Sequence, residues 1–181
     1  YGHAYNAEAV LLLSEIDPVQ NSRVSNASAT MPGVDCVPLA EYEQNMTAGY
    51  PCTVDYDPMY FLINGEPTVD LPAGDPADMA LLRFLNAGLR SHTPSIVGVE
   101  MGLIAEDGNA YPGQPRIQSA VLLAAGKTLD AIIDMPDVDH TYSLFDRMPT
   151  FSNENLPNGG SLANLTVGTG SPPVTDPTNL A

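Results

Sequence analysis

Short apolar segments separated by turn signals set the strongest limit on the fold of this chain. The pattern predicts roughly seven to nine strands, and the candidate segments are 8–16, 60–63, 67–71, 79–86, 95–99, 101–105, 117–123, 128–134, 141–146 and 161–167. Turn signals recur about every 8–12 residues, a spacing typical of an antiparallel β-sandwich or Greek-key barrel. No βαβ alternation is present. We therefore expect an all-β domain over residues 1–167, followed by a Pro/Thr/Gly-rich linker over 168–181.

The chain between the first two predicted strands is expected to be a long irregular loop, over 19–57. Within it, only 39–46 has the composition for two turns of helix. Cys36 and Cys52 both lie there, with 15 residues between them. A disulfide would stabilise such a loop by about 3 kcal/mol, and we predict that bond, with two unrelated free thiols as the alternative.

The charge of the chain excludes several classes of partner. It has 6 Lys+Arg against 22 Asp+Glu, a net charge of −16. Nucleic acids and anionic membrane surfaces both need clustered cations, so neither is expected as a partner. The longest apolar run, at 9–13, is far shorter than the roughly 20 residues that span a bilayer. The acidic excess fits an extracellular or saline setting and equally fits simple solubility, and we expect an extracellular or periplasmic location.

Histidine is scarce, and this limits the chemistry of the chain. The three histidines are His3, His92 and His140, and neither cysteine has a histidine within ten residues downstream. A blue-copper site takes two histidines and one cysteine, often with an axial methionine. The spacing here does not suit such a site, and a three-copper cluster needs more imidazoles than the chain has. We therefore predict no metal site and no catalytic residue in this chain.

The order of several segments resembles the second cupredoxin domain of the multicopper oxidases, the laccase-like family. AEAVLLLSEIDP at 7–18 is similar to the opening of that domain. FLINGEPTVDLPAGDPADMALLRFLNAGL at 61–89 resembles its ING…LR-x-x-NA segment, and VEMGLIAEDGNAYPGQPRIQSAVLLAAGKTLDAIIDMP at 99–136 its IA-x-DG hairpin and following strand. TYSLFDR and GGSLANLTV resemble its final strands. The likeness covers about four fifths of the chain and implies a cupredoxin-like sandwich.

The resemblance also implies a role. In three-domain members, domains 1 and 3 supply the copper ligands, and domain 2 holds them in register and can form a wall of the substrate cleft. This chain lacks the H-x-H pairs and the HCH segment of copper-bearing domains. We therefore expect a copper-free domain, inactive alone, whose partners are flanking cupredoxin domains. The parent oxidoreductase would use copper to couple one-electron oxidation of substrate to reduction of O₂ to water.

Three residues outside the cysteines stand out. His92 lies in a predicted loop, where it is either a loop or interface histidine or a contact with substrate or a neighbouring domain. Arg83 interrupts an apolar strand and is expected to form an internal ion pair. Asp130, within an alternating strand, is either its partner or a surface residue. Such a pair would serve packing rather than catalysis.

Two other functions stay open. The chain could be a stand-alone secreted β-sandwich module that binds carbohydrate or protein through an aromatic platform. With no Trp, that platform would consist of tyrosines such as Tyr42, Tyr50, Tyr56 and Tyr60. The third possibility is a degenerate metal site built from His92 and acidic residues. The starting residue, Tyr1, and the absence of a signal peptide lead us to expect an excised segment or a mature product.

Overall fold

A computed structural model describes the parts of the chain that carry the fold, namely residues 2–30, 36–37, 40, 50–52, 56–148 and 160–170. The chain divides into two compact units. One consists of Tyr1–Glu15 with Phe61–Ala181, and the other is Ile16–Tyr60. No helix among the described residues is long and apolar enough to cross a membrane.

The larger sheet belongs to the first unit, apart from the adjoining ends of β1 and β4. Within the described ranges it has seven strands in the order β10-β8-β11-β6-β1-β4, with β9 paired to β8. Its strands are β1 (Ala7–Ile16), β4 (Tyr60–Ile63), β6 (Met79–Asn86), β8 (Met101–Glu106), β9 (Asn109–Ala110), β10 (Arg116–Gln118) and β11 (Thr128–Asp134). Six of these strands fall on segments that the sequence predicts.

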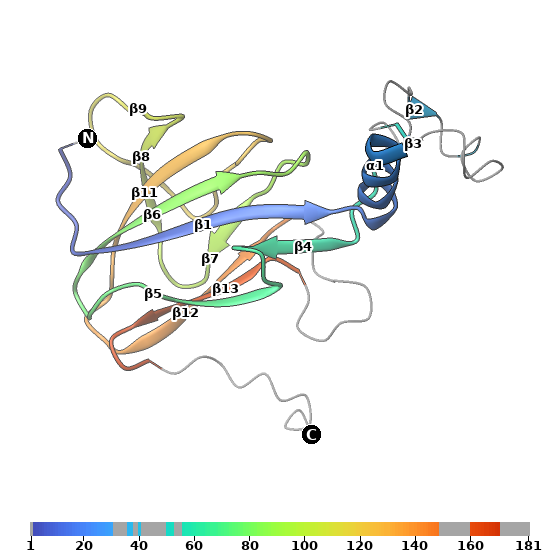
Figure 1. Ribbon diagram of the computed structural model, residues 1–181. Coiled ribbons are helices and arrows are strands. Elements are labelled where there is room, and N and C mark those ends of the chain that lie inside the picture. Colours follow the sequence, from blue (N-terminus) through green and yellow to red (C-terminus); the bar gives the residue numbers. More distant parts are fainter. Residues whose placement is uncertain are drawn as a thin grey trace. The chain divides into compact units, whose positions relative to one another are not determined.

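The smaller sheet forms the second layer of the sandwich, which Figure 1 shows with β5, β13 and β12 facing β1 and β6. Its order is β5-β13-β12-β7. The strands are β5 (Thr68–Pro72), β7 (Pro94–Ile96), β12 (His140–Asp146) and β13 (Leu162–Val167). The predicted β-sandwich is therefore confirmed. The chain beyond β13 is described as far as residue 170, so the predicted linker lies mostly outside the described residues.

The prediction of purely antiparallel pairing was wrong, because each sheet contains one parallel pair. β1 runs parallel to β6, and β5 runs parallel to β13. In both pairs the two strands are far apart in the chain and no hairpin joins them, so nothing in the connection forces an antiparallel direction. The sandwich thus consists of two mixed sheets.

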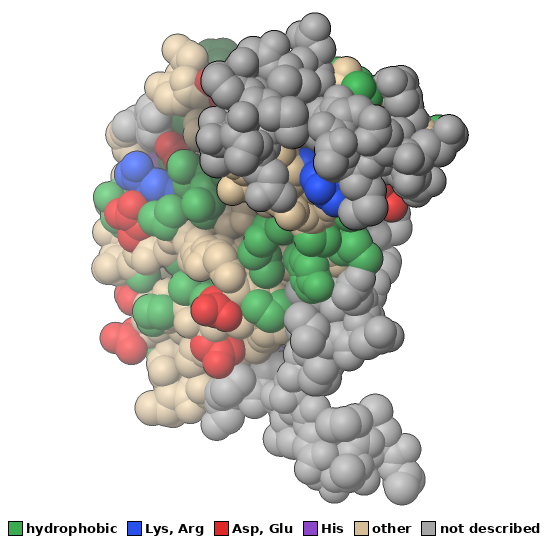
Figure 2. Space-filling view, turned by 45° about the vertical axis from the view of Figure 1, so that its right-hand side comes forward, with side chains coloured by type: hydrophobic (Ala, Val, Ile, Leu, Met, Phe, Trp, Pro, Cys, Tyr) green, Lys and Arg blue, Asp and Glu red, His purple; other side chains and the backbone are tan. Residues whose placement is uncertain are grey.

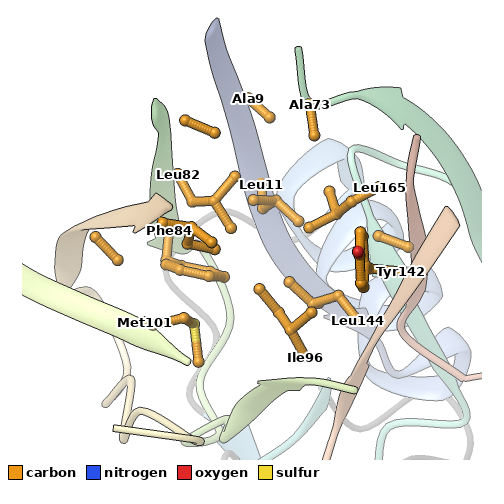
Figure 3. Packing of buried hydrophobic residues seen from close by; sticks show 14 of the residues in the cluster. Ala9, Leu11, Ala73, Leu82, Phe84, Ile96, Met101, Tyr142, Leu144 and Leu165 are labelled. Carbon is orange, nitrogen blue, oxygen red and sulfur yellow. The ribbon is translucent and has the colours of Figure 1, made fainter. Parts of the chain in front are cut away.

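The core lies between the two sheets, and Figure 3 shows its close packing. From the larger sheet, Leu11, Leu82 and Phe84 point inward and are completely buried. Leu144 and Leu165 meet them from the smaller sheet. Alternate residues of a strand point to opposite faces, so the inward series on β1 is Ala9, Leu11 and Leu13. This period of two recurs along β6, β11 and β12.

Two turns of the larger sheet have the backbone conformation that their sequences favour. Asn64 and Gly65 have φ angles of 53° and 84°, and Asp107 and Gly108 have 48° and 75°. Positive φ at both central residues is the signature of the tight hairpin turn that suits the twist of paired strands. The Asn64 side chain also accepts a hydrogen bond from Leu12 N at 2.8 Å, which attaches the turn to β1.

The strand predicted over 117–123 is much shorter in the structure. β10 ends at Gln118, and the chain then forms isolated bridges from Ala120 to Ser95 and from Leu123 to His92. Because Ser95 belongs to β7 of the smaller sheet, the segment leaves one sheet and crosses toward the other. An apolar run that crosses between layers is buried like a strand but does not pair like one.

The second unit contains α1 (Pro18–Thr30), where the sequence predicts an irregular loop. Asp17 explains the helix, because its Oδ1 accepts hydrogen bonds from Val19 N and Gln20 N at 2.9 and 3.0 Å. Aspartate is a preferred N-cap, and proline is favoured at the first helical position. The sequence predicts a strand that ends at residue 16 and no helix after it. The predicted helix over 39–46 lies almost wholly outside the described residues.

The second unit also holds a disulfide between Cys36 and Cys52. Cys36 is in β2 (Cys36–Val37), which pairs in parallel with β3 (Tyr50–Pro51). Cys52 N donates to Val37 O at 3.1 Å, so the backbone and the side chains join the same two segments. Neither sulfur is available as a thiolate while this bond is intact.

Candidate functional site

Two acidic residues occupy inward positions of strands whose other inward residues are apolar. On β1, Glu15 follows Leu11 and Leu13 in the inward series. On β12, Asp146 follows Tyr142 and Leu144 in the same way. Both acidic side chains are inaccessible to solvent. A buried carboxylate is costly unless it is paired and hydrogen-bonded, so each position requires a partner.

His92 is that partner for both acids. Its Nδ1 lies 2.6 Å from Asp146 Oδ2, and its Nε2 lies 3.1 Å from Glu15 Oε2. The ring is completely buried. An ionised carboxylate can only accept a hydrogen bond, so both ring nitrogens act as donors in this arrangement. We call Glu15, His92 and Asp146 the buried cluster.

The segment between β6 and β7 carries His92 and completes the shell around Glu15. Glu15 Oε1 accepts hydrogen bonds from Leu89 N at 2.6 Å and Arg90 N at 2.8 Å. Asn86, at the end of β6, fixes this segment because its Nδ2 donates to Arg90 O and its Oδ1 accepts from Gly88 N, both at 2.8 Å. The carboxylate is thereby held by backbone N–H groups as well as by the imidazole.

Gly88 allows Glu15 to approach this segment closely. A Cβ atom added at Gly88 would overlap the carboxyl group of Glu15. The Asn86-Ala87-Gly88 sequence lies where β6 ends. In the structure it supplies an anchor at Asn86 and a gap at Gly88, and both position the buried cluster.

Asp146 is held in a similar way from the other side. Its Oδ1 accepts hydrogen bonds from Thr93 N at 2.6 Å and Met148 N at 3.1 Å. The cluster therefore joins the larger sheet, through Glu15, to the smaller sheet, through Asp146. His92 lies in the segment that passes from one sheet to the other, and its backbone also exchanges two hydrogen bonds with Leu123.

The environment shifts the pKa of all three side chains toward the charged form. Burial alone would lower the pKa of His92, but hydrogen bonds to Asp146 and Glu15 and the charges of both raise it to about 9. Burial alone would raise the pKa values of Glu15 and Asp146. The hydrogen bond from His92, the backbone N–H donors and the imidazolium charge lower them instead. At neutral pH the cluster is thus an imidazolium between two carboxylates.

The geometry of the buried cluster provides an ionic link between the two sheets. A carboxylate–histidine pair can act as a base only where a nucleophile or substrate reaches the free ring nitrogen. In the buried cluster both ring nitrogens face carboxylates, and none of the three side chains is exposed. The His92 ring does not reach the surface of the described chain, and its expected contact with substrate or a neighbouring domain stays a prediction.

The structure gives Arg83 a different partner from the predicted one. Arg83 Nε lies 2.9 Å from Glu8 Oε1 on β1, and both side chains are more than a third exposed. Asp130 lies opposite Arg83 in the pairing of β11 with β6. Both residues therefore share the solvent face of the larger sheet, and the ion pair that Arg83 forms is a surface one.

The donor groups of the chain do not fit a blue-copper centre. Such a centre needs a cysteine thiolate and two imidazoles with free nitrogens. Both cysteines are joined in the disulfide, and both nitrogens of His92 are engaged with carboxylates. His3 and His140, the other two histidines, are exposed. These same observations make His92 unsuited to the degenerate metal site considered from the sequence.

No protein-family model matches the chain, and no curated protein matches it. Solved structures do. A blue copper oxidase from Nitrosomonas europaea aligns over 89% of this chain and 43% of its own, with a TM-score of 0.63 and 21% identity. Fet3p, a multicopper oxidase that functions in iron import, aligns over 95% and 30%, with a TM-score of 0.62 and 17% identity. This chain has a cupredoxin-like fold.

The similarity extends to another class of copper enzyme. A copper-containing nitrite reductase from Thermus scotoductus aligns over 94% of this chain and 33% of its own, with a TM-score of 0.57 and 14% identity. The cupredoxin-like chain thus spans less than half the length of each of these three proteins. At such low identities the likeness establishes the fold, and the fold alone.

Proposed function

We propose that the chain is a copper-free cupredoxin domain of a multicopper oxidase, which acts as a scaffold for flanking domains and can form a wall of the substrate cleft. The observation that carries this proposal is the replacement of copper chemistry by structural pairing. A cupredoxin-like sandwich here has its cysteines in a disulfide and its one buried histidine between two carboxylates.

The size and order of the chain support the same conclusion. It aligns with 30–43% of the length of three copper enzymes. The motifs that resemble the second domain of laccase-like oxidases occur at β1, β4–β6, β8–β11 and β12–β13, in the family's order. In the parent enzyme the copper would be held by other domains, and this chain's residues would only position them.

The proposal includes a location and a set of partners. A disulfide forms and persists in oxidising compartments, so the Cys36–Cys52 bond supports an extracellular or periplasmic parent. The net charge of −16 argues against nucleic acid as a partner. The partners we propose are the flanking cupredoxin domains of the same polypeptide.

Translating the reading frame on both sides of the chain and assaying its complete product tests the proposal. We expect H-x-H and H-C-H segments outside residues 1–181, and a product that contains copper and oxidises substrate with O₂. Replacing His3 and His140 together by Ala should leave its copper content unchanged, because the ligands lie elsewhere. A product without such segments, or a copper–thiolate absorption band from this chain alone, would contradict the proposal.

The alternative of a stand-alone binding module has no specific support among the described residues. Its tyrosine platform would include Tyr42 and Tyr50, whose side chains lie outside the description. Tyr56 and Tyr60 are partly buried rather than presented on a surface.

A further inference from the structure

Asn64 attaches the β4–β5 turn to β1 through its side chain as well as its backbone. Its backbone N donates to Leu12 O at 2.9 Å. Its Oδ1 accepts a hydrogen bond from Leu12 N at 2.8 Å, and its Nδ2 donates to Val10 O at 2.9 Å. A side-chain amide offers a carbonyl acceptor and an N–H donor, as a peptide group does. The amide of Asn64 therefore continues the hydrogen bonding of β4 with β1 after β4 has ended at Ile63.

The position of this turn makes the attachment important. In the described part of the larger sheet, β4 is the last strand of the order and β1 is its neighbour. The backbone of the turn is closed on itself, because Ile63 N donates to Glu66 O at 2.8 Å and Glu66 N donates to Ile63 O at 3.0 Å. Residues 64–66 are exposed. The turn at this sheet edge is thus joined to β1 through Asn64.

The Asn64-Gly65 sequence is also chemically reactive. Asparagine is thermolabile, and a following glycine leaves its own backbone nitrogen unhindered because it has no Cβ. Gly65 N can attack Cγ of Asn64, which closes a succinimide ring and releases Nδ2 as ammonia. Water then opens the ring to aspartate, or to isoaspartate, in which the main chain runs through the former side-chain carbon. Water is the one co-reactant, and the turn is exposed to it.

In the folded chain the hydrogen bonds to β1 oppose this reaction. The amide of Asn64 is bound at its oxygen and at its nitrogen, so its carbon cannot swing toward Gly65 N until both bonds open. The backbone is fixed as well, with φ angles of 53° at Asn64 and 84° at Gly65. A Cβ added at Gly65 would meet nothing within 4 Å, so hydrogen bonding rather than crowding restrains the pair. The reaction therefore requires local opening of the sheet edge.

Neither product can restore the attachment. In aspartate a carboxylate oxygen replaces the Nδ2 donor, so an acceptor would face the carbonyl oxygen of Val10, which is itself an acceptor. In isoaspartate the main chain is longer by a methylene group, which does not fit a hairpin turn with two central residues. Both products add a negative charge to a chain of net charge −16, whose surface already carries scattered acidic side chains (Figure 2).

We infer that Asn64 is a deamidation site that the fold keeps unreactive, and that its conversion to aspartate or isoaspartate irreversibly detaches the β4–β5 turn from β1. Opening of the sheet edge at β4 is the trigger. The inference requires neither copper nor flanking domains, so it goes beyond the proposed function and is tested independently of it.

Peptide mapping by mass spectrometry of the disulfide-intact chain tests the protection of Asn64. At mildly alkaline pH, deamidation there should be about tenfold or more slower in the native chain than in the chain unfolded by urea, because the two amide hydrogen bonds must open first. Asn158-Gly159, the second Asn-Gly pair of the sequence, is the internal reference in urea. Equal rates at Asn64 in the native and unfolded chains would overturn the inference. So would an unreactive Asn64 in urea where Asn158 reacts.

The Gly65→Ala variant separates the chemistry from the fold, because it is measured in urea, where folding has no influence. The added methyl group hinders attack by the nitrogen of residue 65, so deamidation at Asn64 should slow severalfold. Asn158 in the same molecule should react at its unchanged rate. If Asn64 reacts equally fast in the two unfolded chains, attack by this nitrogen is not the route and the assignment of the site is wrong.

Hydrogen exchange tests the detachment of the turn. In a sample deamidated in urea and refolded, the backbone N–H groups of Leu12 and residue 64 should exchange about tenfold or more faster in the modified molecules than in the unmodified ones. Asn64→Asp should reproduce this increase. Asn109→Asp, at an exposed asparagine in the turn between β8 and β9, is the matched control and should leave both N–H groups unchanged. Unchanged exchange in the modified molecules or in Asn64→Asp would overturn the inference.

Discussion

Among the described residues, the ion pairs centred on His92 and the ion pair of Arg83 differ in burial, and the difference shows which charges determine the fold. The buried cluster joins His92 to Glu15 and Asp146 with no side-chain exposure, at 3.1 and 2.6 Å. Arg83 and Glu8 approach as closely, at 2.9 Å, but remain more than a third exposed. Only the buried cluster joins the two sheets, whereas the Arg83–Glu8 pair lies on the surface of the larger sheet.

The comparison teaches that closeness of charges is a poor measure of their importance. Removing one member of a buried pair leaves an uncompensated charge in a medium of low dielectric constant. When one member of an exposed pair is removed, water solvates the remaining charge, so little stability is lost. Ion pairs with similar distances between their charged atoms can therefore contribute very differently to the free energy of unfolding.

His92→Ala should give the largest loss of stability. It leaves Glu15 and Asp146 buried without their cation, which is expected to lower the free energy of unfolding by about 3–5 kcal/mol. Chemical denaturation of the disulfide-intact chain measures this, with His3→Ala as the control because His3 is exposed. A loss below about 1 kcal/mol for His92→Ala would remove the distinction between the two ion pairs.

The pH dependence of unfolding should reveal the same cluster without mutation. Because the pKa of His92 is raised from 6.5 to about 9 on folding, its contribution is complete below 6.5 and is lost as the pH rises through about 9. That loss amounts to about 3 kcal/mol. The lowered pKa values of Glu15 and Asp146 give the opposite dependence, so their contribution disappears as the pH falls through those values.

Denaturant midpoints measured across this range provide the check. The wild-type chain should lose stability from near neutral pH toward alkaline pH, and the His92→Ala variant should show a flat profile there. Parallel profiles for the two proteins would mean that another group titrates and that His92 is not the imidazolium of the cluster.

Gly88→Ala should have an intermediate effect. The added methyl group would overlap the carboxyl group of Glu15 and force the segment or the carboxylate to move, at a cost of about 1–3 kcal/mol. The effect should shrink in a Glu15→Ala background, because the overlapping group is then absent. Equal losses in both backgrounds, measured by denaturation, would locate the strain elsewhere than at Glu15.

Substitutions in the exposed pair should have the smallest effect. Arg83→Met or Glu8→Gln is expected to change the free energy of unfolding by less than about 1 kcal/mol. This change should be smaller still at high salt, because salt screens exposed charges. Asp130→Asn should change it by no more than about 0.5 kcal/mol. A loss of several kcal/mol at Arg83 would show that this pair, and not the buried cluster, is the main ionic element.

Much of the sandwich could be predicted from the sequence because it depends on local patterns. β6 and β11 were predicted with the bounds that the structure gives, since alternation and turn dipeptides are visible in one short window. Helix α1 was not predicted because Asp17-Pro18 can end a strand as well as start a helix, and the prediction took it as the end of the strand. The parallel pairing of β1 with β6 depends on distant residues and leaves no local signal.

The buried cluster was missed for a related reason, although a signal was present. Glu15 continues the inward series of Leu11 and Leu13, and Asp146 continues that of Tyr142 and Leu144. Two carboxylates at inward positions need a buried cation, and His92 is one of only three histidines. Extending the alternation of each strand to its last residue would have pointed to Glu15 and Asp146. Their shared contact with His92 depends on the tertiary structure.

The state of the His92 ring tests the central claim most directly, because it separates structural pairing from metal binding. Heteronuclear NMR of the imidazole nitrogens in the chain, with and without added copper, measures this state. The account predicts protons on both nitrogens at neutral pH, a pKa of about 9 and no change at His92 when copper is added. A ring nitrogen without a proton at neutral pH, or one bound to copper, would contradict it.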